Sequence, residues 1–263
     1  HTITTKPWNL ETAIDKYAAA GIGGITVWRD TLKGRDLADT GKRIKDAGLE
    51  TVALVRGGFF CYSDAEERQK SFTDNRLAIR EAETIGAPMV VLVCGAKPNQ
   101  SLEESRKQIR EGIEAVLPHA EASGVTLAIE PLHPMYADDR SAVNDLRTAN
   151  EMAEYFKSDF VGVAVDVYHL WWDPCLKEEI MRCGKNGNLT AFHVCDWRTP
   201  TEDFLLDRGL MGEGCINIPQ IRGWVEQAGF KGFNEVEIFS SKRWSGDQDV
   251  WLKEITEAYL TSV

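Results

Sequence analysis

The sequence predicts a single (β/α)8 barrel, and three observations favour this fold class. Short apolar segments alternate with longer amphipathic ones along the whole chain, a pattern typical of a parallel sheet with helical crossovers. Eight such pairs can be counted in 263 residues, which is close to the usual size of an eight-stranded α/β barrel. No linker rich in Pro, Gly or Ser divides the chain, so residues 1–263 are expected to form one domain.

The clearest expected strand is Val161–Val165, an uninterrupted apolar run that is too short for a helix. Such runs are typical of strands that are buried on both faces of a parallel sheet. The other expected strands share its short length and apolar character. In chain order, the eight are Thr2–Thr5, Gly24–Trp28, Glu50–Val55, Met89–Val93, Val125–Ile129, Val161–Val165, Leu189–Phe192 and Phe233–Ile238.

Amphipathic segments between these strands predict helices, several of which stop at a glycine. Gly21, Gly48 and Gly86 follow three of them, where a left-handed residue commonly ends a helix. Pro118 is expected to kink or shorten the fourth helix. The expected helices are Leu10–Ala20, Asp36–Ala47, Ala65–Ile85, Leu102–Ser123, Ala142–Phe156, Leu176–Cys183, Ile218–Ala228 and Gln248–Leu260.

A doubly wound sheet is the alternative fold for alternating strands and helices. That fold would require a G-x-G-x-x-G turn after its first strand. The nearest candidate, Gly21-Ile22-Gly23-Gly24, lacks this spacing, so the barrel is favoured.

The net charge of −11 argues against two classes of partner. Proteins that bind nucleic acids usually carry a basic surface that neutralises phosphates, and no basic patch is visible in this sequence. The same charge is a poor match for anionic membranes, and no apolar run reaches the ~18 residues of a membrane span. We therefore expect a small, neutral or weakly charged substrate. The last two strand ends lack a glycine-rich phosphate loop, which favours an unphosphorylated one.

Six cysteines are scattered along the chain without a C-x-x-C pair. In a chain of this length, that pattern predicts reduced thiols and, with them, a cytoplasmic location. The chain begins at His1 without an initiator Met or a visible signal peptide, which leaves open whether the N-terminus is processed or trimmed.

Four of the expected strands place a side chain that can bind a metal at their ends: Glu130, Asp166 and His193 follow strands five to seven, and strand eight carries Glu237. Neighbouring barrel strands end at the same rim, so these side chains can converge on one point. Any one of them alone could cap a helix, pair with a cation or, for the histidine, be a satisfied core residue. Together they predict one divalent ion, with Mn²⁺ first, Mg²⁺ or Co²⁺ next, and Zn²⁺ less favoured.

Several motifs together resemble the xylose-isomerase-like barrel superfamily over nearly the whole chain. They are Ile129-Glu130-Pro131-Leu132-His133-Pro134, Val165-Asp166-Val167-Tyr168-His169, Phe192-His193-Val194-Cys195-Asp196, Gly212-Glu213-Gly214-Cys215-Ile216-Asn217-Ile218-Pro219 and Val236-Glu237-Ile238-Phe239. That superfamily includes sugar and sugar-phosphate isomerases and epimerases, inosose-processing enzymes and family 2 AP endonucleases. The resemblance implies metal ligation by the same four residues, and substrate contacts from His169 and Arg198. In its ketose 3-epimerase branch, the glutamates that match Glu130 and Glu237 are catalytic and exchange a proton on opposite faces of the substrate.

The endonuclease branch of that superfamily fits poorly. Its trinuclear zinc site needs extra histidines at the early strand ends, where this chain has Arg56 and Cys94. It also needs an Asp-x-His sequence in the seventh loop, where this chain has Asp207-Arg208-Gly209. DNA repair is therefore not expected, and Arg208 is not expected to affect metal binding.

Further residues near the strand ends are candidates for substrate binding. His133 follows Glu130 closely and is either an acid/base group or a rigid loop residue. Arg56 stands at the exit of the third strand. Trp28 and Trp171 could stack on the apolar face of a sugar, or pack in loops or at a subunit interface, which leaves a homo-oligomer open.

The sequence therefore predicts a metal-dependent isomerase or epimerase of a sugar, keto-sugar or keto-inositol that moves a proton next to a carbonyl. A metal-dependent lyase or dehydratase acting on a keto-inositol or an oxidised glycoside would use the same residues, because a leaving group could depart from the same enediolate. A barrel that binds a carbohydrate or a partner without catalysis is the third interpretation, although it has no need of two opposed bases. Substrate, metal and oligomeric state are left open.

Overall fold

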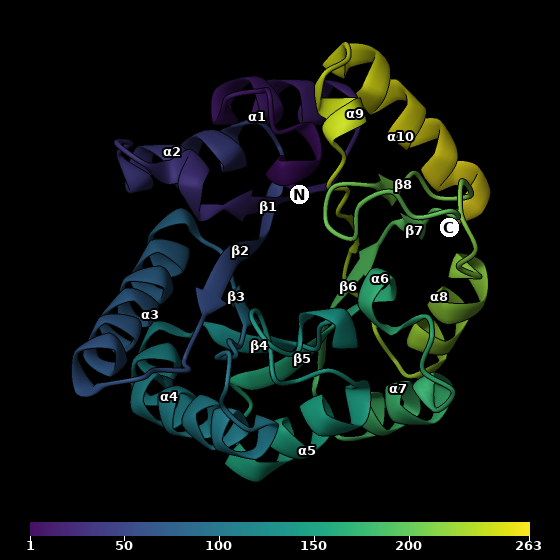
Figure 1. Cartoon of the computed structure of the whole chain (residues 1–263). Coiled ribbons are helices and arrows are strands. Elements are labelled where there is room, and N and C mark those ends of the chain that lie inside the picture. Colours follow the sequence, from purple (N-terminus) through teal and green to yellow (C-terminus); the bar gives the residue numbers. More distant parts are fainter.

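Seven parallel strands curve into a nearly closed barrel in the computed structural model, which describes all 263 residues (Figure 1). Their order in the sheet is β1-β2-β3-β4-β5-β6-β9. They are β1 (Gly24–Trp28), β2 (Glu50–Gly58), β3 (Met89–Val93), β4 (Thr126–Glu130), β5 (Val161–Asp166), β6 (Leu189–Val194) and β9 (Asn234–Val236). A separate antiparallel ribbon consists of β7 (Asp196–Trp197) and β8 (Arg208–Gly209). The predicted fold class is confirmed.

Helices form an outer ring around the strands (Figure 1). The two longest begin at side-chain caps, Asp64 and Ser101, and end at left-handed glycines, Gly86 and Gly124. The helices are α1 (Leu10–Ala19), α2 (Leu37–Asp46), α3 (Ala65–Ile85), α4 (Leu102–Ser123), α5 (Leu146–Phe156), α6 (Val167–Leu170), α7 (Leu176–Lys185), α8 (Ile218–Gln227), α9 (Ser241–Trp244) and α10 (Gln248–Ser262). Short 3₁₀ helices are η1 (Thr2–Thr5), η2 (Arg29–Leu32) and η3 (Pro134–Tyr136).

Most observed boundaries lie close to the predicted ones, because apolar periodicity is a local signal. Strands β1 and β3 and helix α3 begin and end at the predicted residues. Helix α5 begins later than predicted, because the Asp145 carboxylate accepts a hydrogen bond from the Thr148 N–H (2.7 Å) and caps the helix there. Pro118 does not shorten α4, which continues past it with Ala120 buried in the core.

The first predicted strand is wrong: Thr2–Thr5 forms the 3₁₀ helix η1. Its threonine hydroxyls form hydrogen bonds with backbone groups of β9 and β1, in the place of the backbone groups that an eighth strand would supply. The Thr4 hydroxyl donates to the Val236 carbonyl (3.0 Å), and the Thr2 hydroxyl accepts from the Trp28 N–H (3.0 Å). These bonds bridge β9 and β1, which do not pair with each other. The sheet therefore has seven strands and an opening between β9 and β1, which we call the seam.

Small side chains fill the barrel interior, and the larger apolar layer packs between the sheet and the helices. Ala128, Ala164 and Ala191 are the interior residues of β4, β5 and β6. Because side chains alternate along a strand, the residue two positions further on points to the same side. That residue is Glu130 in β4, Asp166 in β5 and His193 in β6. Three of the predicted ligands are thus directed into the barrel by strand periodicity alone.

Two further expectations concern the chain as a whole. All six cysteines are free thiols, as the scattered pattern predicts, and four of them are buried. None of the helices combines the length and apolar character needed to cross a bilayer.

Candidate metal centre

The four predicted ligands converge at the carboxyl end of the barrel. Glu130, Asp166 and His193 extend from three adjacent strands, and Glu237 directly follows β9. All four side chains are buried, and one ligand atom from each lies within 4.8 Å of the others. Asp166 and His193 are also register partners across β5 and β6. Residues separated by more than a hundred positions in sequence therefore share one small volume.

A single guanidinium links two of these carboxylates. Arg208 Nη1 donates to Asp166 Oδ2 (3.1 Å) and to Glu237 Oε2 (3.0 Å), and the side chain is almost fully buried. Its Nη2 donates to His169 Nε2 (3.2 Å). On the other side of the cluster, His193 Nδ1 lies 3.0 Å from Glu130 Oε1. Arg208 is not expected from the sequence to affect metal binding, yet the ribbon β7–β8 places it in contact with two of the predicted ligands.

Asp196 explains how the loop that follows Arg208 is held in place. Its buried carboxylate accepts backbone N–H bonds from Trp197, Gly212, Gly214 and Ile216, at distances of 2.8 to 3.0 Å. The loop after β8 is thereby tied to β7, the partner strand of β8. A strand of two residues has no recognisable local sequence pattern. The position of Arg208, in β8, therefore could not be predicted from the sequence.

His1 is a second residue that sequence reasoning missed. Its buried imidazole lies 2.9 Å from Glu237 Oε1 through Nδ1 and 3.2 Å from Glu235 Oε2 through Nε2. Its ring also packs edge-on against the ring of His193, with centroids 4.6 Å apart. Its position depends on η1, whose conformation the threonine-rich sequence does not predict.

The clustering of charges shifts several pKa values. Burial raises the pKa of Asp166 to about 6. Burial would lower the pKa of His193, but nearby carboxylates, Glu235 foremost, raise it to about 10. Burial would raise the pKa of Glu237, but nearby cationic groups, His1 foremost, hold it below its usual range. The site therefore groups several carboxylates in one buried volume, and this arrangement favours cationic groups beside them.

The residues fit a bound divalent ion. Three carboxylates and one imidazole form a hard, mostly oxygen donor set, which suits Mn²⁺ or Mg²⁺ and also accommodates Zn²⁺. His193 Nε2 is buried and has no hydrogen-bond partner in the protein. Buried polar atoms rarely remain unpaired, so a ligand to this nitrogen is expected.

Three of the predicted substrate-binding residues, His169, Arg56 and Trp28, line a cavity of about 120 Å³ beside the cluster. We call it the mouth cavity. Its lining is Trp28, Val55, Arg56, Val93, Glu130, Leu132, Tyr136, Arg140, His169, Leu205, Arg208, Glu237 and Phe239. Both predicted catalytic glutamates are among these residues.

The other three predicted substrate-binding residues do not line this cavity. Arg198 forms an ion pair with Asp207 instead. His133 packs against Trp197, with ring centroids 5.1 Å apart, and Trp171 packs against the same ring at 5.5 Å. These three residues lie in the loops around the site, and the arginine that lies beside His169 is Arg208.

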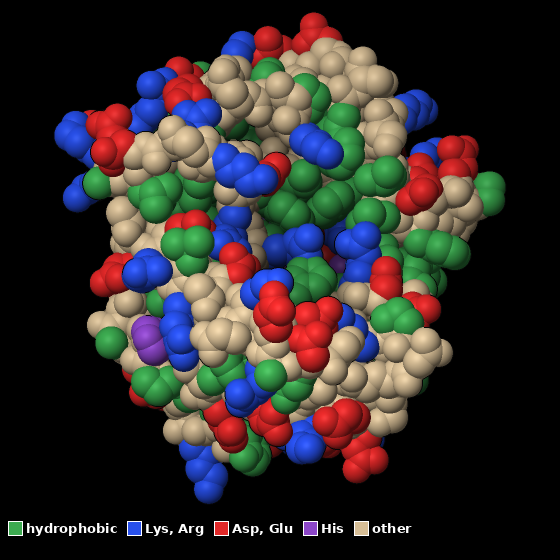
Figure 2. Space-filling view, turned by 60° about the vertical axis from the view of Figure 1, so that its left-hand side comes forward, with side chains coloured by type: hydrophobic (Ala, Val, Ile, Leu, Met, Phe, Trp, Pro, Cys, Tyr) green, Lys and Arg blue, Asp and Glu red, His purple; other side chains and the backbone are tan.

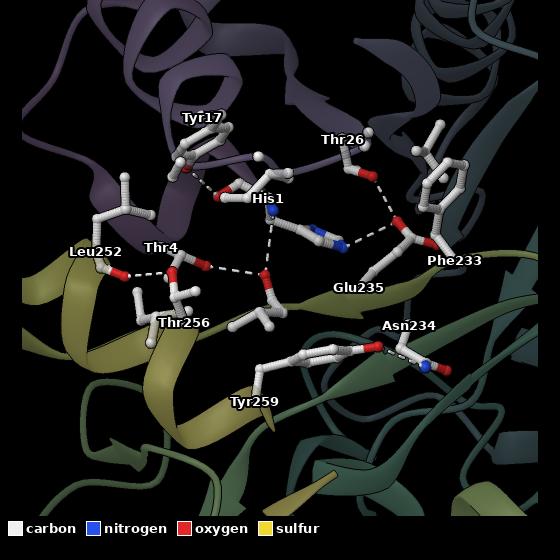
Figure 3. Close-up of a pocket in the computed structure, with 18 of the residues that line it drawn as sticks. His1, Thr4, Tyr17, Thr26, Phe233, Asn234, Glu235, Leu252, Thr256 and Tyr259 are labelled. Carbon is white, nitrogen blue, oxygen red and sulfur yellow. Dashed lines mark hydrogen bonds and ion pairs between the residues drawn. The ribbon is translucent and has the colours of Figure 1, made fainter. Parts of the chain in front are cut away.

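A larger cavity of about 420 Å³ lies at the seam, and we call it the seam cavity (Figure 3). It is lined by residues of η1, α1, β1, β9 and α10, mostly threonines, glycines and apolar side chains. Its only carboxylate, Glu235, is already paired: the Thr26 hydroxyl and the His1 imidazole both point toward it (Figure 3). None of Glu130, Asp166, His193 and Glu237 lines this cavity, so it is a weaker candidate for the reactive site than the smaller one.

Comparisons with known proteins agree with this architecture. The family model of the xylose isomerase-like TIM barrel matches residues 14–258. Protein SMc04130 from Sinorhizobium meliloti 1021 is 44% identical, with a TM-score of 0.96 over 100% of this chain and 96% of that one. No match is found among curated proteins.

Two more distant structures share the fold. The IolI protein with a bound zinc atom is 20% identical, with a TM-score of 0.88 over 100% of this chain and 96% of that one. D-psicose 3-epimerase, in the presence of D-fructose, is 16% identical, with a TM-score of 0.79 over 97% of this chain and 93% of that one. With a family model that matches nearly the full length, the chain belongs to the xylose isomerase-like TIM barrel family.

Proposed function

We propose that this protein is a divalent-metal-dependent isomerase or epimerase of a sugar, keto-sugar or keto-inositol. One observation carries the proposal: two glutamates from separate strands, Glu130 and Glu237, border both the ligand cluster and the mouth cavity. Strands β5 and β6 lie between the strands that supply them. Two carboxylates can therefore approach one substrate from different sides. A protein that only binds a carbohydrate has no need of such a pair.

Glu130, Asp166, His193 and Glu237 would hold the ion, which when bound polarises a substrate carbonyl and the neighbouring hydroxyl. Mn²⁺ stands first for this donor set, and the zinc bound to the IolI protein keeps Zn²⁺ as an alternative. The fold that the chain shares with D-psicose 3-epimerase is consistent with chemistry next to a carbonyl.

The proton transfers belong to the two glutamates. The Glu237 carboxylate removes a proton from the carbon beside the carbonyl, as a general base. A proton returned by Glu130 to the opposite face of the same carbon gives the epimer, and one returned to the adjacent carbon gives the isomer. Arg208 Nη1 bonds both Asp166 and Glu237, which fixes the direction from which Glu237 approaches the substrate.

His169 is positioned to hold a substrate hydroxyl. Because a guanidinium can only donate, the bond from Arg208 makes His169 Nε2 an acceptor and leaves the proton on Nδ1. That Nδ1 atom is buried without a partner in the protein. A hydroxyl oxygen of the substrate would satisfy it, which gives this histidine an orienting role.

Solvent deuterium exchange tests the proposal directly. The chain is loaded with Mn²⁺ and incubated in D₂O with a panel of ketoses and keto-inositols, and NMR follows the carbons next to the carbonyl. We expect deuterium to enter one of these positions, and product analysis then distinguishes epimer, isomer and the alkene that a lyase would form. A barrel that binds no Mn²⁺, or exchange that is unchanged in the Glu237→Gln variant, would overturn the proposal.

A further inference from the structure

The mouth cavity contains two arginines that take no part in the ligand cluster. Arg56 belongs to β2, and Arg140 lies in the loop that follows η3. Both line the cavity that also holds Glu130 and Glu237. Figure 2 shows Lys and Arg side chains gathered with hydrophobic ones around a hollow on one face of the molecule. On a chain with a net charge of −11, such a local cluster of cations needs an explanation.

Arg56 is a guanidinium without a partner. Its Nη1 atom is buried and makes no hydrogen bond, and no carboxylate lies within 4.0 Å of the side chain. Its guanidinium lies over the ring of Phe59, 4.3 Å from the centroid. Arg29, in η2 directly after the neighbouring strand β1, shows the usual arrangement: it pairs with Asp74 at 2.9 Å and with Glu81 at 2.6 Å. Leaving a buried charged donor unpaired is costly, so a missing anion is the economical explanation.

Arg140 is poorly paired as well. Its only ion pair is with the adjacent, exposed Asp139 at 3.8 Å, and its guanidinium lies over the ring of Tyr136 at 5.3 Å. Arg140 also acts on Arg56 directly: burial first, and the charge of Arg140 next, lower the pKa of Arg56. Two like charges thus line one cavity, and neither forms an ion pair with a carboxylate of that cavity. Planar guanidinium groups in this position are well suited to bind the oxygens of a carboxylate or phosphate.

We propose that Arg56 and Arg140 bind an anionic oxygen group of the substrate, so that the protein acts on an acidic sugar, either a sugar carboxylate or a sugar phosphate. This inference rests on the proposed function, because it assigns the carbonyl end of the same molecule to Glu130 and Glu237. The expectation of an unphosphorylated substrate relied on the absence of a glycine-rich loop. Side-chain cations do not need such a loop, and they serve either kind of anion.

Direct binding of small probes tests the anion site. Isothermal titration on the full chain, equilibrated with Mn²⁺ at constant ionic strength, would use inorganic phosphate, glycolate and uncharged glycerol. Any probe that ligates the metal does so in wild type and in the variants alike. The difference in affinity between wild type and a variant therefore measures the contribution of the substituted arginine. We expect Arg56→Met and Arg140→Met each to weaken binding of one anion by at least about tenfold, since a lost charge-assisted bond is worth that much.

Matched variants make the outcome decisive. Arg110→Met removes the same charge from the outer helix α4, where the guanidinium lies over Tyr155, and should leave anion binding unchanged. In the absence of anion, the Arg56→Met variant should also melt at a higher temperature than wild type, because a buried unpaired charge is lost. If Arg56 had only a structural role, its loss would lower the melting temperature instead. Tighter binding of phosphate indicates a sugar phosphate, and tighter binding of glycolate a sugar acid.

Equal affinity of wild type and Arg56→Met for both anions overturns the inference. Because these titrations involve no turnover, that failure is separate from a failure of deuterium exchange, which would concern the proposed function.

Discussion

The mouth cavity and the seam cavity both border the barrel interior. The mouth cavity is the smaller of the two, but it is lined by more charged side chains. The mouth cavity, at about 120 Å³, contains two ligand glutamates, His169 and two poorly paired arginines. The seam cavity, at about 420 Å³, contains one carboxylate that is already paired with its neighbours. Volume alone would select the seam cavity, because large pockets are the usual first candidates for binding sites. The mouth cavity is selected instead because the candidate metal ligands Glu130 and Glu237 and the unpaired Nη1 of Arg56 line it.

The difference has a structural origin. At the carboxyl ends of β4, β5 and β6, successive parallel strands must end at one rim, so their terminal side chains accumulate there. At the seam, no strand lies between β9 and β1, and the hydroxyls of Thr2 and Thr4 bridge the opening. Charged side chains therefore gather at the mouth. The seam is formed by the unpaired edges of two strands and by small side chains.

The largest expected effect of a single substitution is at Glu237. Glu237→Gln removes the general base and should lower the rate of deuterium exchange about 10³-fold, within the range that general-base catalysis supplies. The measurement is NMR-detected exchange at saturating Mn²⁺. Glu226→Gln, on the exposed face of α8, makes the same chemical change at a surface pair with Arg222 and should leave the rate unaltered. Retained exchange in the Glu237 variant would remove the mouth from consideration as the reactive site.

The next expected effect is on stability, through Arg208. Arg208→Met leaves the buried carboxylates of Asp166 and Glu237 without their counter-charge, and should destabilise the metal-free protein by about 3 kcal/mol. Urea unfolding with and without Mn²⁺ checks this, and added Mn²⁺ should recover part of the loss. Arg198→Met removes a partly exposed arginine that directly follows β7 and is paired with Asp207 alone, so it should cost less. An equal loss with and without Mn²⁺ would show that the arginine and the ion do not share a site.

His193 tests where the ion binds. His193→Ala removes the one nitrogen ligand and should weaken Mn²⁺ binding by at least about tenfold, since even the supporting partners of metal ligands matter that much. Titration calorimetry gives the affinity. In wild type, Mn²⁺ at 100 times its Kd should stabilise the fold by about 2.7 kcal/mol, and a tenfold weaker affinity should reduce this gain to about 1.4 kcal/mol at the same concentration. Unchanged affinity would move the ion away from this cluster.

The sequence predicted the mouth much better than the seam. Strand periodicity sufficed to place Glu130, Asp166 and His193 on one face, because alternation along a strand is a local property. Thr2–Thr5 was misassigned because β-branched residues favour strands, while the bonds that fix η1 are made by hydroxyls to strands far along the chain.

Residues brought to the site by long-range contacts were also beyond the reach of sequence patterns. Arg208 depends on two strands of two residues each and on the Asp196 carboxylate, which ties the following loop to β7. The spacing after His193 pointed to Arg198 instead, which the structure commits to Asp207. Strand ends can thus be predicted from the sequence, whereas the loops that cover them depend on tertiary structure.

The smallest expected effect lies at the seam. Tyr259→Phe removes the hydroxyl that accepts a hydrogen bond from Asn234 Nδ2 (2.9 Å) beside the seam cavity (Figure 3). The loss should be about 1 kcal/mol in urea unfolding, the usual net value of one such bond, with exchange and Mn²⁺ affinity unchanged. Asn234 begins β9, and Glu237 follows the end of that short strand, so the two cavities are only one strand apart. A tenfold fall in exchange would therefore mean that the seam sets the position of Glu237, and the division between a reactive mouth and a passive seam would fail.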